Sequence, residues 1–308
     1  MTSWLEAVGS RWASVHAVPA MTRVPAWALA VTAILSVQIG AAISVGLFSQ
    51  IGIAGTAWIR ITLGAIGVIL IARPRYWRWT WRELRTPVLL GIVSAGMTLS
   101  FMAAISLLPL GTAVAIEFLG PLTVAALHSR SRRSLAWPLL ALAGVVLLTE
   151  PWRGEPNWLG IAFAIISGVC WGLYIVITQR VGDRFSGVDG LAISLPVAAL
   201  VTAGIGVPQV WGHLTVEVLL IALAAAILLP LLPWILELYA LRRLTKAAFG
   251  TLMALEPAIA LVIGMIVLRQ VPIGLQVLGI AFVVVAGIAA ERSGHRDDDA
   301  TERVPPAA

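Results

Sequence analysis

Two carboxylates lie beside prolines within long apolar stretches of the chain. Glu117 and Pro121 belong to the stretch TAVAIEFLGPL, and Glu256 and Pro257 belong to the stretch GTLMALEPAIA. Proline has no N–H to donate, so it leaves the carbonyl four residues earlier without its helical partner. Lipid supplies no hydrogen bonds, so freed carbonyls and acids at membrane depth require a cavity lined by protein or water. The spacing therefore predicts two helix breaks whose acids exchange protons with such a cavity.

The two stretches repeat each other, because Pro257 follows Pro121 by 136 residues. Glu237 is a third candidate for proton exchange, although it lies near the end of its apolar stretch, where a side chain can reach water. The alternative role for these acids is a structural pair with an arginine or a backbone N–H. Elsewhere the repeat is weak, and the match of Ser36 with Ser167 carries little weight alone.

Five further residues are candidates for a substrate cavity. Arg60 is the one basic residue inside an apolar stretch, and it could meet a substrate carboxylate, pair with a buried acid or extend outward to water. Ser36 and Gln38 could line a hydrophilic path, or they could support close helix packing. Trp171 and Tyr174 share one helical face, where they could wall a cavity or pack against a neighbouring helix.

The composition indicates a polytopic membrane protein. The chain has 308 residues, of which 59% are hydrophobic and 12% charged, against roughly 45–50% and about 25% in soluble domains. A membrane span needs about 20 apolar residues. Ten stretches qualify, which predicts an all-α protein with transmembrane helices at about 26–48, 53–72, 87–107, 111–128, 135–150, 158–179, 187–207, 216–238, 247–268 and 272–290.

The basic residues predict the orientation, since lysine and arginine collect in cytoplasmic connections. Eighteen of the 21 fall on one side of these ten stretches, and only Arg153 and Arg269 fall on the other. Both termini are therefore expected in the cytoplasm, and the protein in the bacterial inner membrane. Topology accounts for the net charge of +6, so nucleic-acid binding is not needed to explain it.

The ten stretches divide into two sets of five. An odd number in each set makes the second enter the membrane from the opposite face, as in the inverted repeats of secondary transporters. We expect a cytoplasmic segment at 1–25, a first repeat at 26–150 and a second repeat at 151–290. The polar, proline-ended segment 291–308 is expected to be a disordered tail.

Signatures of enzymes are missing from the sequence. It contains no HExxH, GxSxG or Walker A motif, and its four histidines are scattered. Cys170 is the only cysteine, which excludes a disulfide framework and a cysteine metal site. We therefore predict neither enzymatic activity nor a metal or cofactor.

The stretches AISLLPLGTAVAIEFLGPL and ALRRLTKAAFGTLMALEPAIA, with the ten-span pattern, resemble the drug/metabolite transporter superfamily, EamA type. Within it, SVQIGAAISVGLF (36–48), AWIRITLGA (57–65) and LELYALRRL (236–244) are most similar to the bacterial threonine/homoserine exporters. This resemblance implies a basket of helices around a central cavity, and export driven by a proton gradient.

The leading prediction is an inner-membrane exporter of small amino acids, threonine- or homoserine-like, or of related metabolites, working by proton antiport. An alternative is a facilitative carrier or an exporter of another small solute, such as a drug, an aromatic metabolite or a lipid head group. An integral-membrane enzyme or a structural subunit is the third alternative. The expected partners are the small-molecule substrate, protons and the lipid bilayer, and a homodimer is left open.

Overall fold

The computed structural model describes residues 24–74, 79–128, 136–150, 156–182, 185, 189–233, 236, 240 and 252–302. Within them every regular element is a helix, which confirms the predicted all-helical class. The helices are α3 (Ala26–Val45), α4 (Phe48–Ile51), α5 (Ile53–Ala72), α6 (Trp81–Leu107), α7 (Leu110–Glu117), α8 (Leu119–His128), α9 (Ala136–Thr149), α10 (Trp158–Gly182), α11 (Asp189–Val210), α12 (Val216–Ala226), the π-helical segment η3 (Ile227–Leu231), α15 (Glu256–Val267) and α16 (Gly274–Glu302).

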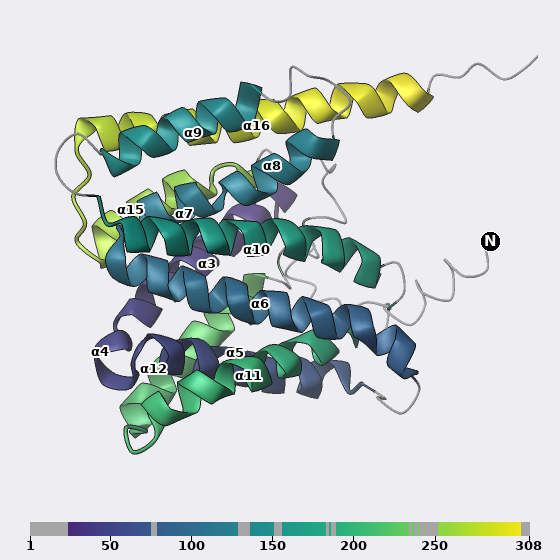
Figure 1. Cartoon of the computed structure of the whole chain (residues 1–308), viewed down its shortest axis with the longest axis vertical. Helices are drawn as coiled ribbons and strands as arrows, with labels where there is room; N and C mark the ends of the chain where they lie inside the picture. Colours follow the sequence, from purple (N-terminus) through teal and green to yellow (C-terminus); the bar gives the residue numbers. More distant parts are fainter. Residues whose placement is uncertain are drawn as a thin grey trace, which may run out of the picture.

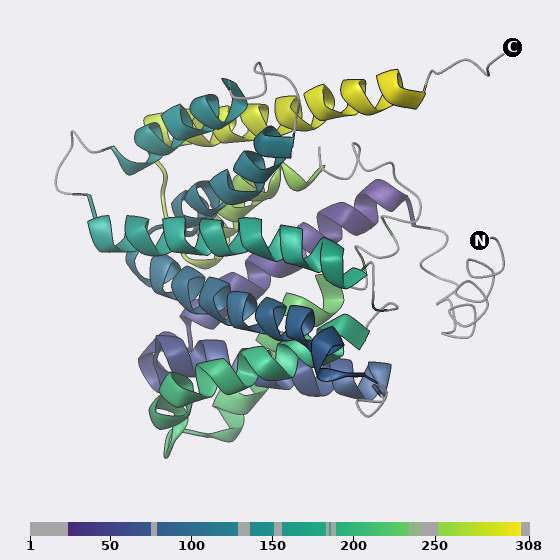
Figure 2. The same ribbon diagram turned by 45° about the vertical axis from the view of Figure 1, so that its right-hand side comes forward.

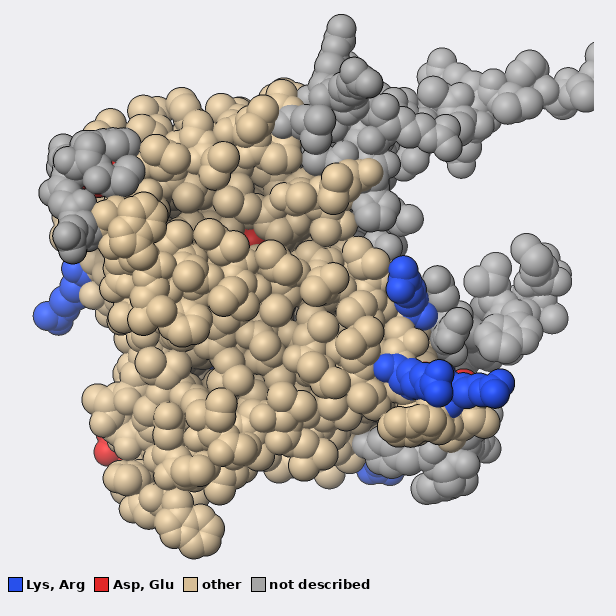
Figure 3. Space-filling model, viewed as in Figure 1, with Lys and Arg blue, Asp and Glu red and all other residues tan. Residues whose placement is uncertain are grey.

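Five of the described helices are long and apolar enough to cross a membrane, namely α3, α5, α6, α10 and α11. Large apolar side chains cover the outer surface of the bundle, and Leu70 of α5, Leu127 of α8, Leu200 of α11 and Ile266 of α15 each expose two thirds or more of their area. Figure 3 shows this apolar surface as a broad belt between two charged ends. A belt of this kind is stable in lipid, so the fold is that of an integral membrane protein.

The helices run side by side in stacked pairs (Figures 1 and 2). α9 lies along α16 at one edge, α10 lies along α6 in the middle, and α11 lies along α5 at the other edge. Between the first two pairs, α7 packs against both α10 and α15, and α15 also packs against α3. The interior of the bundle is therefore built largely from α3, α7, α10 and α15.

Glycines bring α9 and α16 into backbone contact. A Cβ atom added at Gly144 would lie 2.5 Å from the carbonyl oxygen of Gly279, and one added at Gly279 would lie 2.6 Å from the carbonyl oxygen of Gly144. Any larger residue at either position would force the backbones apart. Small residues allow this kind of close helix crossing in membranes.

The helical structure is interrupted near both Pro121 and Pro257. α7 ends at Glu117, and after the single residue Phe118 the chain continues as α8, with Pro121 in its first turn. α15 begins at Glu256, with Pro257 as its second residue, directly after a turn. The stretch expected as one helix at 111–128 is therefore two helices.

A third break was not predicted. The stretch at 216–238 was expected to be one uninterrupted helix, but α12 ends at Ala226 and the chain continues into η3. Leu229 within η3 has an extended conformation, with φ −157° and ψ 109°, and Pro230 follows it. The physical reason is the missing N–H of Pro230, which cannot continue an α-helical hydrogen-bond ladder.

The C-terminal segment also differs from the prediction. α16 continues to Glu302, so residues 291–302 are helical, whereas 291–308 was expected to be a disordered tail. No proline occurs between Gly274 and Glu302, and extending an existing helix adds one hydrogen bond for each residue fixed. The N-terminal segment to residue 23 and the last six residues lie outside the described parts.

Candidate functional site

Glu117 is a buried acid at the first break, with only 8% of its surface exposed. The hydroxyl of Ser167, on α10, donates a hydrogen bond of 2.5 Å to Oε1 of Glu117. The same hydroxyl lies 3.1 Å from the carbonyl oxygen of Met97 on α6. A hydroxyl has one hydrogen to donate, so these two oxygens compete for it. Ser167 thus joins three helices, α6, α7 and α10.

Arg60 lies inside the bundle and does not extend outward to water. Its side chain is 5% exposed, and its Nη1 atom has no hydrogen-bond partner among the described residues. It interacts electrostatically with Glu117, but no ion pair within 4.0 Å joins the two. A buried guanidinium nitrogen without a partner costs free energy, which makes Arg60 a candidate for binding an anion.

The second acid, Glu256, is half-buried at the start of α15. Nε2 of Gln38, on α3, donates a 3.1 Å hydrogen bond to Oε1 of Glu256. Gln38 is only 1% exposed, and its Oε1 atom has no hydrogen-bond partner in the described parts of the chain. The third predicted acid, Glu237, lies outside the described residues.

Ser36 makes the same kind of contact as Ser167, because each serine hydroxyl lies against a backbone carbonyl of another helical segment. Its hydroxyl donates a 2.7 Å hydrogen bond to the carbonyl of Leu228, in η3. The serines are 131 residues apart, and the carbonyls of Met97 and Leu228 are also 131 residues apart. The weak sequence match between Ser36 and Ser167 therefore coincides with a matching pair of hydrogen bonds.

The carbonyl of Glu117 does not face an open cavity, as the position of Pro121 suggested. It faces α10, because a Cβ atom added at Gly168 would lie 2.8 Å from the Glu117 carbonyl oxygen. A Cβ atom added at Gly120 would lie 1.9 Å from the carbonyl oxygen of Gly168. The sequence signal for this crossing is the GxxxG pattern of Gly168 and Gly172, which is typical of close helix packing in membranes.

The two aromatic candidates pack in different clusters. Trp171 packs against a cluster formed by residues of α7, α8, α9 and α16, with its ring 6.2 Å from that of Phe118 at an angle of 66°. Tyr174 packs beside Leu90 and Ile177, between α6, α10 and α11. Although they share one helix, they contact separate parts of the core, and their role as cavity walls stays a prediction.

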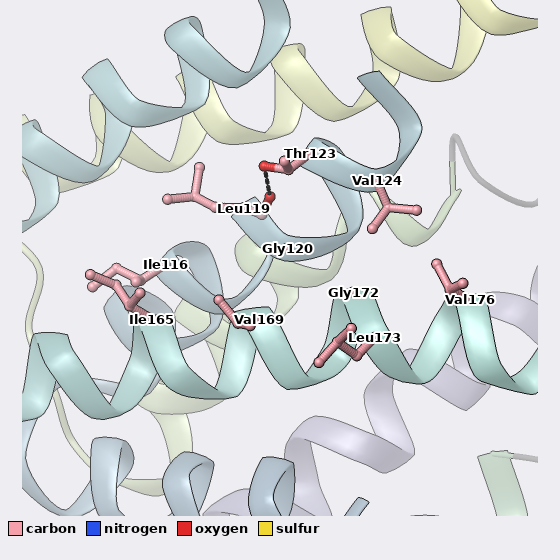
Figure 4. Close-up of a pocket in the computed structure, with 11 residues that line it drawn as sticks. Ile116, Leu119, Gly120, Thr123, Val124, Ile165, Val169, Gly172, Leu173 and Val176 are labelled. Atoms are coloured by element: carbon pink, nitrogen blue, oxygen red, sulfur yellow. Dashed lines mark hydrogen bonds between the residues drawn. The ribbon is translucent and has the colours of Figure 1, made fainter. Parts of the chain in front are cut away.

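A groove of about 370 Å³ runs between α8 and α10, beside the first break. Figure 4 shows its lining, which includes Ile116, Thr123, Val169 and Leu173. The Thr123 hydroxyl bonds to the Leu119 carbonyl of its own helix, so this groove offers few polar partners to a ligand. The arrangement suits contact with lipid better than binding of a charged solute.

The comparisons with known proteins agree with the fold. Residues 158–290 match the model of the EamA-like transporter family. The threonine/homoserine exporter RhtA of Salmonella typhimurium strain LT2 is 36% identical over 288 residues, covering 91% of this chain and 97% of that protein. RhtA of Escherichia coli strain K12 is 35% identical over 293 residues, covering 92% and 97%.

A crystal structure of another protein has the same fold, with a TM-score of 0.58 at 19% identity over 88% of this chain and 98% of that one. The similarity to RhtA extends over nearly the whole chain, so the assignment does not depend on the two breaks alone. It confirms the prediction of a membrane transporter of small molecules rather than an enzyme. The chain belongs to the EamA-like transporter family.

Proposed function

We propose that this protein exports small amino acids, such as threonine and homoserine, across the bacterial inner membrane in exchange for protons. The substrate class follows from the names of its RhtA relatives, which cover most of the chain. The observation that carries proton exchange is the environment of Glu117, an acid that is 8% exposed and hydrogen-bonded to a neutral hydroxyl.

A buried charge is costly unless an opposite charge contacts it. No ion pair within 4.0 Å joins Glu117 to Arg60, so the acid lacks contact with the nearby cation. An acid that alternates between water and such an interior is suited to carrying a proton. Glu256 is the second proton carrier in this proposal, because it is half-buried at the interruption of the second half, as Glu117 is buried at that of the first. Glu237 stays a third candidate.

The test measures flux of radiolabelled L-threonine in proteoliposomes after a pH step. Glutamine has nearly the shape of a protonated glutamate but cannot release a proton. Glu117→Gln and Glu256→Gln should each abolish accumulation driven by the pH step, while exchange of labelled for unlabelled threonine continues. Glu217→Gln is the matched control, because Glu217 is exposed in the first turn of α12.

Accumulation of threonine by both Glu117→Gln and Glu256→Gln after the pH step would contradict proton coupling through these acids. A wild-type protein that equilibrates threonine without responding to pH would instead be a facilitative carrier.

We also propose ten spans in two inverted repeats, at 26–150 and 151–290. Five shorter apolar helical segments accompany the five long helices. The helix contacts of the two repeats correspond to each other. α3 packs on α12 in the same way that α10 packs on α6. The other contacts join each helix of the first repeat to its counterpart in the second, namely α5 to α11, α7 to α15 and α9 to α16. The equal spacing of the two serine contacts supports the same symmetry. A homodimer stays a prediction.

Both termini are proposed to be cytoplasmic. Basic side chains of the described residues gather at the end of the molecule where α6 begins and α10 ends (Figures 1 and 3), as cytoplasmic ends do. Alkaline phosphatase, which is active only outside the cytoplasm, should be inactive in cells when fused after Glu302. Strong activity of this fusion would place the C-terminus outside the cytoplasm and would contradict the proposed orientation.

A further inference from the structure

Two buried polar atoms of opposite kinds have no hydrogen-bond partner among the described residues, and both belong to the interior. Nη1 of Arg60 is a donor that carries positive charge, and Oε1 of Gln38 is an acceptor. The two residues are 5% and 1% exposed. Leaving such atoms unpaired destabilises a protein by the full cost of removing them from water. A ligand that supplies both missing partners would remove that cost.

The two residues lie on helices that share one neighbour. α3 and α5 both pack against η3. Ala42 of α3 and Ala57 of α5 belong to one cluster of buried residues. Gln38 lies one helical turn before Ala42, and Arg60 lies three residues after Ala57, so each side chain is on the face of its helix that turns towards this cluster. Gln38 and Arg60 therefore face the same part of the core.

The charges around the two atoms differ in sign. Gln38 donates its amide Nε2 to Glu256, which fixes the amide plane and leaves Oε1 as the unpaired atom. A cation at Oε1 would also lie near the carboxylate of Glu256. Arg60, in contrast, provides a positive charge that no contacting acid neutralises. One end of this region favours an ammonium group and the other favours a carboxylate.

We propose that Arg60 and Gln38 determine specificity by binding the two charged groups of a zwitterionic α-amino acid. Nη1 of Arg60 donates to the substrate carboxylate, and Oε1 of Gln38 accepts a hydrogen bond from the α-ammonium group. This inference rests on the proposed function and adds how the substrate is recognised. Recognition is through groups that all α-amino acids share, so the side chain of the substrate contributes less to selectivity.

The atoms are sealed from solvent in this conformation. A substrate therefore reaches them only in a conformation in which the helices around η3 separate, as alternating access requires. The site is distinct from the apolar groove between α8 and α10, whose Thr123 hydroxyl is already bonded within its own helix.

The test compares three competitors of radiolabelled L-threonine in counterflow into proteoliposomes. L-threonine has both charged groups, L-threonine amide lacks the carboxylate, and N-acetyl-L-threonine lacks the ammonium group. Wild-type protein should bind L-threonine about 10- to 100-fold more tightly than either analogue, as hydrogen bonds to charged groups require. Ligand-induced stabilisation of the wild-type protein in detergent should rank the three in the same order.

The variants separate recognition from a structural role. Arg60→Gln should weaken the binding of L-threonine about 10- to 100-fold but leave the binding of L-threonine amide nearly unchanged. The variant would thereby lose its selectivity against the amide. Gln38→Met should in the same way lose selectivity against N-acetyl-L-threonine. The controls Thr62→Val and Thr32→Val should keep both selectivities, because these hydroxyls bond to carbonyls of their own helices.

Three results would overturn the inference. If both variants weaken the binding of all three compounds equally, the two residues act only in packing, and the proposal of amino-acid export is unaffected. If wild-type protein binds an analogue as tightly as L-threonine, recognition does not use the missing group, and this result needs no variant to fold. If wild-type protein moves no amino acid, the proposed function fails, and the inference fails with it.

Discussion

The acid comes before the break in the first half of the chain and after the break in the second half. Alignment of Pro121 with Pro257 puts Glu117 opposite Met253 and Gly120 opposite Glu256. In the first half the acid is therefore the last residue of α7, before the break. In the second half the acid is the first residue of α15, after the break.

The neighbouring helix explains this difference. α10 crosses the first break so closely that a Cβ atom at Gly120 would lie 1.9 Å from the Gly168 carbonyl oxygen, which leaves no room for a side chain. At the second break, the side chain of Glu256 has room to meet Gln38 of α3. The comparison shows that helix crossing, rather than the proline, determines where each half can hold its acid.

Gly120→Ala should have the largest effect, because the obstructing atom belongs to the backbone and cannot rotate away. We expect a loss of about 3 kcal/mol of folding free energy, the upper part of the range for overpacking. The measurement is unfolding by SDS in mixed micelles. Gly204→Ala is the control, since a Cβ atom there would meet nothing within 4 Å.

A stable Gly120→Ala protein with normal transport would break the comparison, because it would show that the first break has room for a side chain. Gly204→Ala should be neutral or stabilising, since alanine favours a helix more than glycine does.

Ser167→Ala should have an intermediate effect and sharpen the contrast between the two serines. Ser167 bonds to the Glu117 carboxyl group, whereas Ser36 bonds to a backbone carbonyl of η3. We expect losses of about 2 kcal/mol for Ser167→Ala and about 1 kcal/mol for Ser36→Ala, because hydrogen bonds to ionisable groups are stronger. SDS unfolding measures both, and equal losses would mean that the carboxyl group adds nothing.

Pro121→Ala should have the smallest effect on folding and act mainly on transport. Alanine restores an N–H that can bond to the Glu117 carbonyl and join α7 to α8, so we expect about fivefold slower threonine flux. Pro257→Ala should change flux less, because two turn residues precede α15, whereas the single residue Phe118 separates α7 from α8. The reverse order of the two fluxes would show that the second break is the more important one.

The sequence was sufficient for the helical class, because its apolar stretches are long enough for helices that cross a membrane. The interruption at Pro230 follows from the missing N–H of proline, but no polar side chain marks it, because the surrounding residues are uniformly apolar. Glu117 and Gln38 were recognised as candidates because polar groups are rare within apolar stretches.

The partners of these residues could not be predicted in the same way. Helices such as α10 are apolar on all sides, so no pattern distinguishes the face that contacts protein from the face that contacts lipid. The bond between Ser167 and Glu117 depends on the crossing of α10 with α7. The tight approach of Gly168 to the break also depends on that crossing, although the GxxxG pattern gave a partial signal.

The glycine contact between α9 and α16 has a mechanical consequence. At Gly144 and Gly279 no side chains separate the two backbones, so this crossing is the place about which α16 can rotate relative to α9. From Gly279 to the end of α16 at Glu302, a rise of 1.5 Å per residue gives a lever arm of about 35 Å. A rotation of about 10° at the contact would then move that end by about 6 Å. A spectroscopic label placed near Glu302 would magnify small rearrangements within the membrane into a displacement that can be measured in the water outside it.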